Sequence, residues 1–448
     1  MYKYTIYDQL KRSAKFTKSF HIPGHKASGE FKSKFKDSVL DITELSYSDN
    51  LLCPQVLIKR AQEDIADILK AQKSYITTDG SSSGVLALVY CASKMGNKLI
   101  VFRNSHQSVW NACKLFGVEP LIVQGPEKDG ILQPPGCDII EKLIANDPHI
   151  AGVLATSPDY YGNIAPLAKY KEITKKHNRL LLVDEAHGAH LVFGDKGYAG
   201  LYADMWVDGA HKSLPTLTQG AIVSVNNQDL IPLAEEALSM FRTTSPSFPI
   251  MASVEYGVKS IINKPHILKD AKVTVAKFKA EAEEAGYTFY KSGDWTKLLI
   301  DFKPLNIAPR LVMERLEKRG IFAEFEDGRY ILFYLSPMIW EKDLKNLKKN
   351  LDVIIANKKL QGTYRDKPEF PENERSYSFQ YALKKPNEWI DLDKAVGRMC
   401  AQNVGIVPPC IPVAVVGEML TEAKVKALSQ SKNTFGLKNG QICVVKKN

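Results

Sequence analysis

The segment WVDGAHKSLPTLTQG, residues 206–220, places a lysine where its amine could act as a nucleophile. Lys212 directly follows a histidine and lies between two apolar, strand-like runs, LYADMWV before it and GAIVSV after it. A surface lysine usually has charged neighbours on a helical face, whereas small hydroxyl residues, a proline and a glycine follow this one. Lys212 is therefore a candidate nucleophile, and an exposed lysine on a connecting loop is the alternative.

A hydroxyl-rich turn in TTDGSSSGVLALV, residues 77–89, is a candidate phosphate site. Gly80, Ser81 and Ser82 precede an apolar helix, so backbone N–H groups, hydroxyls and the positive end of a helix dipole coincide. Ordinary helix capping by Asp and Ser explains the same residues. The turn lacks the GK[ST] ending of a Walker P-loop and the GxGxxG fingerprint.

The segment LLLVDEAHGAH, residues 180–190, puts Asp184 at the end of a buried strand. Burial raises the pKa of a carboxyl group unless a cation accompanies it, so Asp184 requires a companion such as a protonated ring nitrogen. A turn or cap residue is one alternative, and a metal site built by Asp184 and Glu185, as in Walker B ATPases, is another. The missing P-loop argues against the ATPase, and we expect no metal site.

These three parts are the ones required to hold pyridoxal phosphate (PLP), and they follow one another along the chain. The turn at Gly80 would take the phosphate, and Asp184 would keep the pyridine nitrogen protonated so that the ring can act as an electron sink. Lys212 would form the Schiff base. The sequence therefore predicts PLP as the cofactor.

Short aliphatic runs alternate with helix-length segments around these candidates, between about residues 55 and 226. The runs are KLIVFRN, EPLIVQG, IAGVLATSP, RLLLVDEAHG, ADMWVDG and GAIVSVN. Continuous apolar strands alternating with helices predict an α/β fold with a mostly parallel sheet covered on both faces. Ligands of such sheets bind where strands give way to loops, which is where the candidate residues lie.

Changes in pattern divide the chain into four predicted parts. These are an N-terminal arm (1–50), a PLP-binding large domain (51–262), a small α+β domain (263–360) and a small C-terminal domain (361–448). The Pro-rich and charged segment LQGTYRDKPEFPENERSYS predicts a linker, and IDLDKAVGRMCAQ, residues 390–402, predicts a helix.

Several motifs resemble one known family. FHIPGHKASGEF is similar to an HxPGHK opening, FRNSHQSVWNA to an RNxHxS run, and GAHKSLPTLTQGA to a THKxLxALTQ block; FRTTSPSFPIMAS and VPPCIPVAVVGE resemble its TTSPSY loop and closing PPxIP…GE block. The chain thus resembles the fold-type I PLP-dependent enzymes, whose fold is like that of aspartate aminotransferase. It resembles most closely the short form of the Orn/Lys/Arg decarboxylase family.

The resemblance implies roles for individual residues. Lys212, Asp184, His106 and His187 would be the catalytic residues, with His106 stacked on the cofactor ring and His187 near the cofactor's phenolic oxygen or the substrate carboxylate. A histidine hydrogen-bonded in a loop is the alternative for His106. The implied cofactor-binding set comprises Gly80, Ser81, Ser82, His106, Asp184, Ala186, His211, Lys212 and Thr244.

Within that set, Ser81 and Ser82 would bind the phosphate, His211 would contact it, and Ala186 would lie against the ring. The implied role of Thr244, with its neighbours Thr243 and Ser245, is a phosphate contact across a dimer interface.

The chain departs from the family pattern at Gly209, at Cys410 and in the closing motif, where VGE replaces PGE. Gly209 replaces a serine and follows Asp208, so a phosphate hydroxyl is missing and a negative charge is added nearby. Either Gly209→Ser restores a lost contact, or Gly209 has a positive φ that serine does not tolerate. Cys410 stands where the family usually has a glycine.

Composition and charge further limit the class of protein. The chain has 448 residues and a net charge of +10, but its Lys and Arg residues are mixed with acids and accompany no nucleic-acid motif, so we expect no nucleic-acid partner. Seven scattered cysteines without a CxxC pair indicate a reducing compartment. No apolar leader or membrane span is evident, and we expect a cytoplasmic protein.

The predicted function is PLP-dependent decarboxylation of arginine, lysine or ornithine to the amine and carbon dioxide by a homodimer or higher oligomer, as in polyamine biosynthesis. Glu324 is a candidate for reading the far end of the substrate, and a solvated strand-end acid is the alternative. Another fold-type I PLP enzyme, such as a lyase or aminotransferase, and a noncatalytic PLP-binding regulatory protein are the competing functions.

Overall fold

The computed structural model describes the chain from residue 1 to 447 except residues 16–17, 19, 367–376, 408–409 and 432. Two compact units form. The first comprises residues 1–91, 182–272 and 336–338, and the second comprises residues 92–181, 273–335 and 339–448. The four domain boundaries expected from the sequence stay a prediction, and most of the expected linker lies outside the described residues.

Strands of the first unit follow in the order β1-β9-β8-β7. Their bounds are β1 Lys73–Thr77, β9 Ala221–Val225, β8 Met205–Asp208 and β7 Leu180–Glu185, with most of β7 in this unit. β7 and β8 are parallel, whereas β9 is antiparallel to both β8 and β1. All residues of β7, β8 and β9 are buried, which is why their sequences are mostly apolar rather than alternating, with acidic residues only at the ends of β7 and β8.

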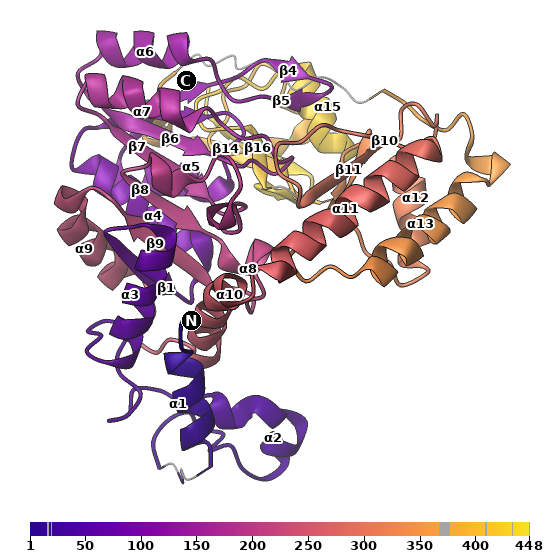
Figure 1. Cartoon of the computed structure of the whole chain (residues 1–448). Helices are drawn as coiled ribbons and strands as arrows, with labels where there is room; N and C mark the ends of the chain where they lie inside the picture. Colours follow the sequence, from indigo (N-terminus) through magenta and orange to yellow (C-terminus); the bar gives the residue numbers. More distant parts are fainter. Residues whose placement is uncertain (16–17, 19, 367–376, 408–409, 432, 448) are drawn as a thin grey trace. The chain divides into compact units, whose positions relative to one another are not determined.

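The first unit also contains α-helices. They are α1 Thr5–Ser13, α2 Gly29–Lys34, α3 Leu57–Leu69, α4 Gly80–Ser93, α8 Ala210–Ser213, α9 Ile231–Phe241 and α10 Phe248–Asn263. α1, α3 and α10 lie side by side (Figure 1). α3 begins where the carboxylate of Asp49 accepts the N–H groups of Val56 and Ile58, at 2.9 and 3.0 Å.

The N-terminal arm brings the HxPGHK-like segment into contact with residues 41–43. In the HxPGHK-like segment, His25 lies 3.2 Å from the Asp41 carboxylate, and Nδ1 of His21 lies 2.8 Å from the Thr43 hydroxyl. The ring of His25 also stacks on Phe31. The residues of this motif therefore shape the arm itself.

The second unit continues the α/β pattern. β6 Ile150–Thr156, β2 Lys98–Phe102 and β3 Glu119–Val123 follow in the order β6-β2-β3, and both β6 and β3 are parallel to β2. Helices α5 Gln107–Phe116 and α6 Cys137–Asn146 lie between these strands in the chain, α7 Leu167–Lys176 follows β6, and β4 Glu127–Lys128 and β5 Ile131–Leu132 form a short hairpin. The sequence-based prediction of an α/β fold with a mostly parallel sheet is confirmed.

A four-stranded antiparallel sheet follows in the same unit, in the order β10-β11-β13-β12. Its strands are β10 Thr288–Phe289, β11 Lys297–Asp301, β13 Tyr330–Tyr334 and β12 Phe325–Glu326. Helices α11 His266–Glu284, α12 Pro309–Glu317 and α13 Glu341–Ile355 pack on it through a core that includes Phe278, Leu298 and Leu351.

Two small three-stranded sheets complete the chain. β14 Asn387–Asp391, β19 Gln441–Val445 and β18 Leu437–Lys438 form one, and β16 Ile411–Ala414, β15 Val404–Ile406 and β17 Thr434–Phe435 the other, with helices α14 Phe379–Leu383 and α15 Glu422–Gln430. The helix predicted over residues 390–402 is wrong. Asn387–Asp391 pairs with the C-terminal strand instead, and Gly397 has a φ of +73° that no α-helix accommodates.

Candidate active site

The hydroxyl-rich turn forms the start of α4 in the first unit. Gly80 has a φ of +75°, and its N–H donates to the carbonyl of Gln219 at 2.9 Å. The hydroxyl of Ser83 donates to the carbonyl of Gly80 and lies 3.0 Å from that of Thr77, so it is engaged within the turn. Ser81 and Ser82 are more exposed than Ser83, and theirs are the side chains that a phosphate group can reach.

A close approach of α4 to the strands depends on Gly84. A methyl group on Gly84 would lie 2.4 Å from Cγ2 of Val207 in β8 and 2.8 Å from Cγ2 of Val223 in β9. The glycine therefore lets the start of α4 lie against the strand that leads to Lys212. The sequence analysis gave Gly84 no role, although a glycine inside an otherwise apolar helix is a signal of such packing.

Asp184 lies near the end of β7 with 3% of its surface exposed. Its Oδ1 accepts the N–H of Ala186 at 3.1 Å. Burial raises the pKa of Asp184, while the positive charge of Lys212 and the Ala186 N–H act in the opposite direction. The carboxyl group is thus in a position where a further cation would favour its ionised form.

Lys212 is carried by the short helix α8, which begins two residues after β8 ends. Its Nζ lies 3.0 Å from Nε2 of His187, which follows β7. His187, Asp184 and Lys212 therefore gather at the carboxyl ends of two neighbouring parallel strands. Ala186 is 6% exposed in the same turn.

His211 is oriented by the residue that precedes β9. Both its backbone N–H and its ring Nδ1 donate to the carbonyl of Gly220, at 3.1 and 3.0 Å. Burial lowers the pKa of His211, the charge of Lys212 acts in the same direction, and the hydrogen bond to Gly220 opposes them. A phosphate anion beside the ring would favour the protonated form, which is the form able to donate from Nε2.

The loop that contains Thr244 lies beside the α4 turn of its own chain. The N–H of Thr243 lies 3.4 Å from the carboxylate of Asp79, and the N–H of Ser245 donates to the Thr243 hydroxyl at 3.2 Å. Arg242 donates to the carbonyl of Ile76 at 3.2 Å, which fixes the start of the loop. Thr244 itself is exposed, and a contact to a neighbouring subunit stays a prediction.

Gly209 is required by space rather than by backbone angle. Its φ is −83°, so the positive φ that the sequence left as one alternative is wrong. A methyl group there would lie 2.5 Å from the carbonyl oxygen of Ala186. The side chain of Asp208 is fully buried and accepts the indole N–H of Trp206 at 3.0 Å.

His106 belongs to the second unit, where it caps α5. Its Nδ1 accepts the N–H of Ser108 at 3.2 Å. This is the hydrogen-bonded arrangement that the sequence left as an alternative, and it leaves the stacking role of His106 a prediction. The next residue, Gln107, donates its N–H to the carbonyl of Cys410 at 3.0 Å.

Arg103 connects the RNxHxS-like motif with the closing motif. Its guanidinium donates to the carbonyls of Pro412 and Val413 at 2.9 and 2.8 Å and lies 3.5 Å from Glu418. Lys424 also pairs with Glu418, at 3.2 Å. Sequence reasoning matched both motifs but missed that their charged residues bind each other; a lone arginine after an apolar strand was the available signal.

Glu324, the candidate for substrate recognition, is an exposed residue of the second unit that accepts a hydrogen bond from the Tyr160 hydroxyl. Pro408 and Pro409 of the closing motif lie outside the described residues.

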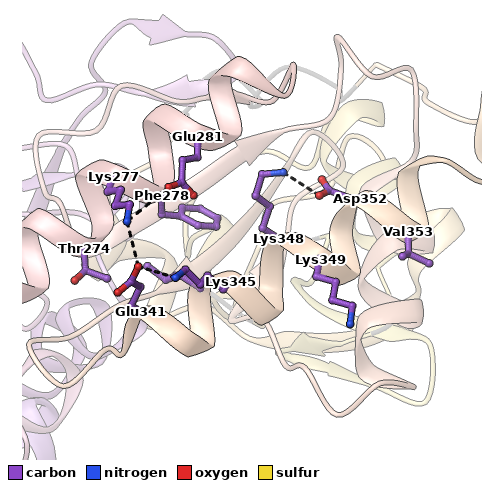
Figure 2. Close-up of a pocket in the computed structure, with 11 residues that line it drawn as sticks. Thr274, Lys277, Phe278, Glu281, Glu341, Lys345, Lys348, Lys349, Asp352 and Val353 are labelled. Atoms are coloured by element: carbon purple, nitrogen blue, oxygen red, sulfur yellow. Dashed lines mark hydrogen bonds and ion pairs between the residues drawn. The ribbon is translucent and has the colours of Figure 1, made fainter.

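A separate groove of about 370 Å³ lies between α11 and α13 (Figure 2). Its lysines are largely neutralised by neighbouring acids: Lys277 and Lys345 both pair with Glu341, and Lys348 pairs with Asp352. The groove contains none of the residues singled out from the sequence. Over the described residues, no cluster of His, Cys, Asp and Glu side chains could hold a metal ion.

A lysine after one parallel strand, a buried aspartate at the end of the next, and a hydroxyl-rich helix start together define the fold-type I PLP-dependent enzymes. The sequence model of the Orn/Lys/Arg decarboxylase major domain matches residues 5–291. The chain belongs to this family, and its class is that of PLP-dependent decarboxylases of basic amino acids. No helix in the described part of the chain is long and apolar enough to cross a membrane.

Individual relatives agree with this assignment. An arginine decarboxylase of Bacillus subtilis is 28% identical over 457 residues, which cover 94% of this chain and 92% of that protein. The constitutive lysine decarboxylase of Escherichia coli has a similar fold, with a TM-score of 0.81 at 19% identity over 99% of this chain and 82% of that one. A serine palmitoyltransferase of S. paucimobilis with bound PLP is more distant, with a TM-score of 0.54 at 13% identity, over 78% of this chain and 83% of that one.

Proposed function

We propose that this chain decarboxylates arginine with PLP held by Lys212, Asp184 and the start of α4. The observation that carries the proposal is the 3.0 Å contact between Lys212 and His187 at the strand end that also holds the buried Asp184. Arginine is the first substrate to test because the relatives named arginine decarboxylase are 27–29% identical over 90–94% of this chain. Those named lysine decarboxylase are 22% identical over 81–86% of it.

The residues present fit the cofactor. Asp184 is a buried carboxyl group whose pKa is raised by burial, and a protonated pyridine nitrogen is the cation that would complete it. The hydroxyls of Ser81 and Ser82 and the positive end of α4 would hold the phosphate. When bound, PLP supplies an electron sink for the pair released as carbon dioxide leaves.

The other side chains of the site would bind the cofactor and the substrate or transfer a proton. Lys212 would attach the cofactor through its amine, and Ala186 would lie against the ring. His187 contacts the Lys212 amine and would receive the substrate carboxylate, while Lys212 or His211 would return a proton to the α-carbon. His106 would stack on the ring, and Glu324, which accepts a hydrogen bond from Tyr160, would bind the guanidinium of the substrate.

The purified protein with PLP is incubated in turn with arginine, lysine and ornithine, and both carbon dioxide and the amine are measured. We expect arginine to yield carbon dioxide and the amine in equal amounts. Lys212→Ala should lose this activity, and the exposed-lysine control Lys358→Ala should keep it. A keto acid in place of carbon dioxide would indicate an aminotransferase. Cofactor binding without turnover of any of the three would indicate a noncatalytic PLP-binding protein.

We further propose a cytoplasmic homodimer in which Thr244 approaches the phosphate of the neighbouring subunit. What supports this is the exposure of Thr244 beside the α4 turn together with exposed aromatic residues on the N-terminal arm.

A further inference from the structure

Two acidic side chains lie next to each other in the core, directly beneath the residues proposed to hold the cofactor. Glu185 ends β7 and Asp208 ends β8, and the two are register partners in the parallel pair. Both are fully buried. Glu185 directly follows Asp184, and Asp208 precedes Lys212 by four residues.

Each acid uses one oxygen to accept a hydrogen bond from a neighbouring N–H. The backbone N–H of Ala199 donates to Oε1 of Glu185 at 2.7 Å, and the indole N–H of Trp206 donates to Oδ2 of Asp208 at 3.0 Å. The other two oxygens, Oε2 of Glu185 and Oδ1 of Asp208, are buried and receive no N–H or O–H from the described residues.

No cation compensates the pair. Within the described part of the chain, neither acid forms an ion pair with a lysine, arginine or histidine. The hydroxyl of Tyr198 also lies near both acids, and it donates to the carbonyl of Leu69 at 2.6 Å. Two neighbouring carboxylates without a cation or further donors would repel each other strongly in such a place.

We propose that Glu185 and Asp208 share one proton, so that the protonated carboxyl of Glu185 donates to the carboxylate of Asp208 and ties the ends of β7 and β8 together. The pair acts as a positioning element that holds Asp184 and Lys212 at their working separation. This role rests on the proposed function, because it concerns the roles of Asp184 and Lys212 there.

The electrostatics agree with this assignment of the proton. Burial, followed by the charge of Asp208, raises the pKa of Glu185 well above its usual range. Burial raises the pKa of Asp208 to about 7, while the hydrogen bonds from Glu185 and Trp206 act to lower it. Both directions agree with Glu185 as the protonated member of the pair and Asp208 as the acceptor.

Gly209 also lies where the ends of β7 and β8 approach each other. Gly209 follows Asp208, and its α-carbon lies so near the Ala186 carbonyl that a methyl group would be 2.5 Å from that oxygen. The residue after each strand end thus also lies close to the other, Gly209 beside the carbonyl of Ala186. The sequence suggested that Asp208 adds a negative charge near the phosphate. Its side chain is instead fully buried next to Glu185.

The shared proton is tested by measuring how the stability of the cofactor-free chain depends on pH. An acid whose pKa is raised by folding contributes stability that is present below its unfolded pKa and is lost as the pH rises through its folded pKa. The folding equilibrium constant of the wild type, measured by urea unfolding from pH 5 to 9, should therefore fall as the pH rises. Each proton that only the folded state retains contributes up to about tenfold per pH unit.

Glu185→Gln keeps a donor for Asp208 without a titrating proton, so it should fold and show a clearly weaker pH dependence than the wild type. Glu236→Gln, on the exposed face of α9, is the matched control and should follow the wild type. Identical pH profiles of Glu185→Gln and wild type would overturn the shared proton.

Positioning is tested separately with the cofactor. Glu185→Ala, which removes the proposed bond from residue 185 to Asp208 and leaves only that from Trp206, should lower turnover by roughly a hundredfold, and Glu185→Gln should restore it. Wild-type turnover in Glu185→Ala would overturn the positioning role. If Glu185→Ala does not fold, turnover of Glu185→Gln within about threefold of wild type across pH 6 to 9 supports the role, and a larger loss overturns it. The unfolding measurement needs no catalysis, so failure of the proposed function leaves the test of the proton intact.

Discussion

At the scale of single residues, the carboxyl group of Asp184 is unusual because it is buried without an ion-pair partner. The charge of Lys212 and the N–H of Ala186 lower its pKa, but burial outweighs them. Such a group is poorly satisfied in the isolated chain and well satisfied beside a pyridinium nitrogen. This is the pattern of a residue kept for function rather than stability.

Asp184→Asn should bind PLP but lose at least about a hundredfold in turnover. A neutral amide cannot keep the ring nitrogen protonated, and each tenfold loss corresponds to about 1.4 kcal/mol of transition-state stabilisation. Steady-state release of carbon dioxide checks this, with Asp229→Asn on the exposed surface as the control. Turnover near that of the wild type would remove Asp184 from the chemistry.

Gly209→Ser should weaken the protein rather than restore a phosphate contact. The added side chain meets a backbone carbonyl that cannot rotate away, and overpacking of this kind costs roughly 1–3 kcal/mol. Urea unfolding measures the loss, and Gly136→Ala, where an added methyl group meets no other atom within 4 Å, is the control. Tighter binding of PLP by Gly209→Ser in equilibrium titration would contradict this account.

At the scale of elements, buried charges join segments that are distant in the sequence. Lys259 of α10 is fully buried and lies 2.7 Å from Asp64 of α3 and 2.7 Å from Glu255. Glu255 also accepts the N–H groups of Thr5 and Ile6 at 2.7 and 2.9 Å. One cluster of charges thus attaches the first helix of the chain to two others.

Lys259→Met should lower the free energy of unfolding by about 3–5 kcal/mol, because it leaves buried carboxylates without their cation. The half-exposed pair of Lys73 and Glu235 provides the control, since Lys73→Met should cost at most about 1 kcal/mol. Urea unfolding compares the two. Equal losses would mean that the buried cluster adds little to stability.

Arg103→Met should destabilise the C-terminal sheets by a similar amount, about 3 kcal/mol, because Glu418 and two carbonyls lose a buried donor. Hydrogen exchange of β15 and β16 reports the loss locally. Arg310→Met removes an exposed ion pair with Glu314 and should leave that exchange unchanged. Unchanged exchange in Arg103→Met would show that other contacts hold these sheets.

The candidates that the sequence predicted depend on short local patterns, whereas the contacts that it missed join residues distant in the sequence. Asp184 and Lys212 were singled out because each follows an apolar, strand-like run. The pairing of Glu185 with Asp208 depends on which strands are neighbours, and the bond from Arg103 to Glu418 joins residues more than three hundred positions apart. The wrong helix over residues 390–402 has the same cause, since pairing with the C-terminal strand overrode a local helical pattern.

At the scale of the whole molecule, the N-terminal arm exposes aromatic side chains. Phe31 and Phe35 stack on each other and are 42% and 59% exposed. Exposed apolar groups of this kind are typical of surfaces that another protein covers. A second copy of the chain is the partner that the proposed homodimer supplies.

The wild type should sediment at about twice the 50.1 kDa of one chain, and Phe31→Ser combined with Phe35→Ser should shift it toward the monomer. Analytical ultracentrifugation separates the two species. Phe322→Ser, at an exposed phenylalanine of the second unit, is the control and should not change the mass. A monomeric wild type would exclude the dimer.

The backbone between α8 and β9 has one more consequence. The carbonyl of Gln219 binds the start of α4, and the carbonyl of Gly220 binds His211 next to Lys212. Two consecutive peptide units therefore bind two ends of the proposed site, the start of α4 and the short helix that carries His211 and Lys212. Insertions or deletions between Pro215 and Gln219 would shift both ends at once, so the length of this connection is expected to be fixed even where its side chains are free to vary.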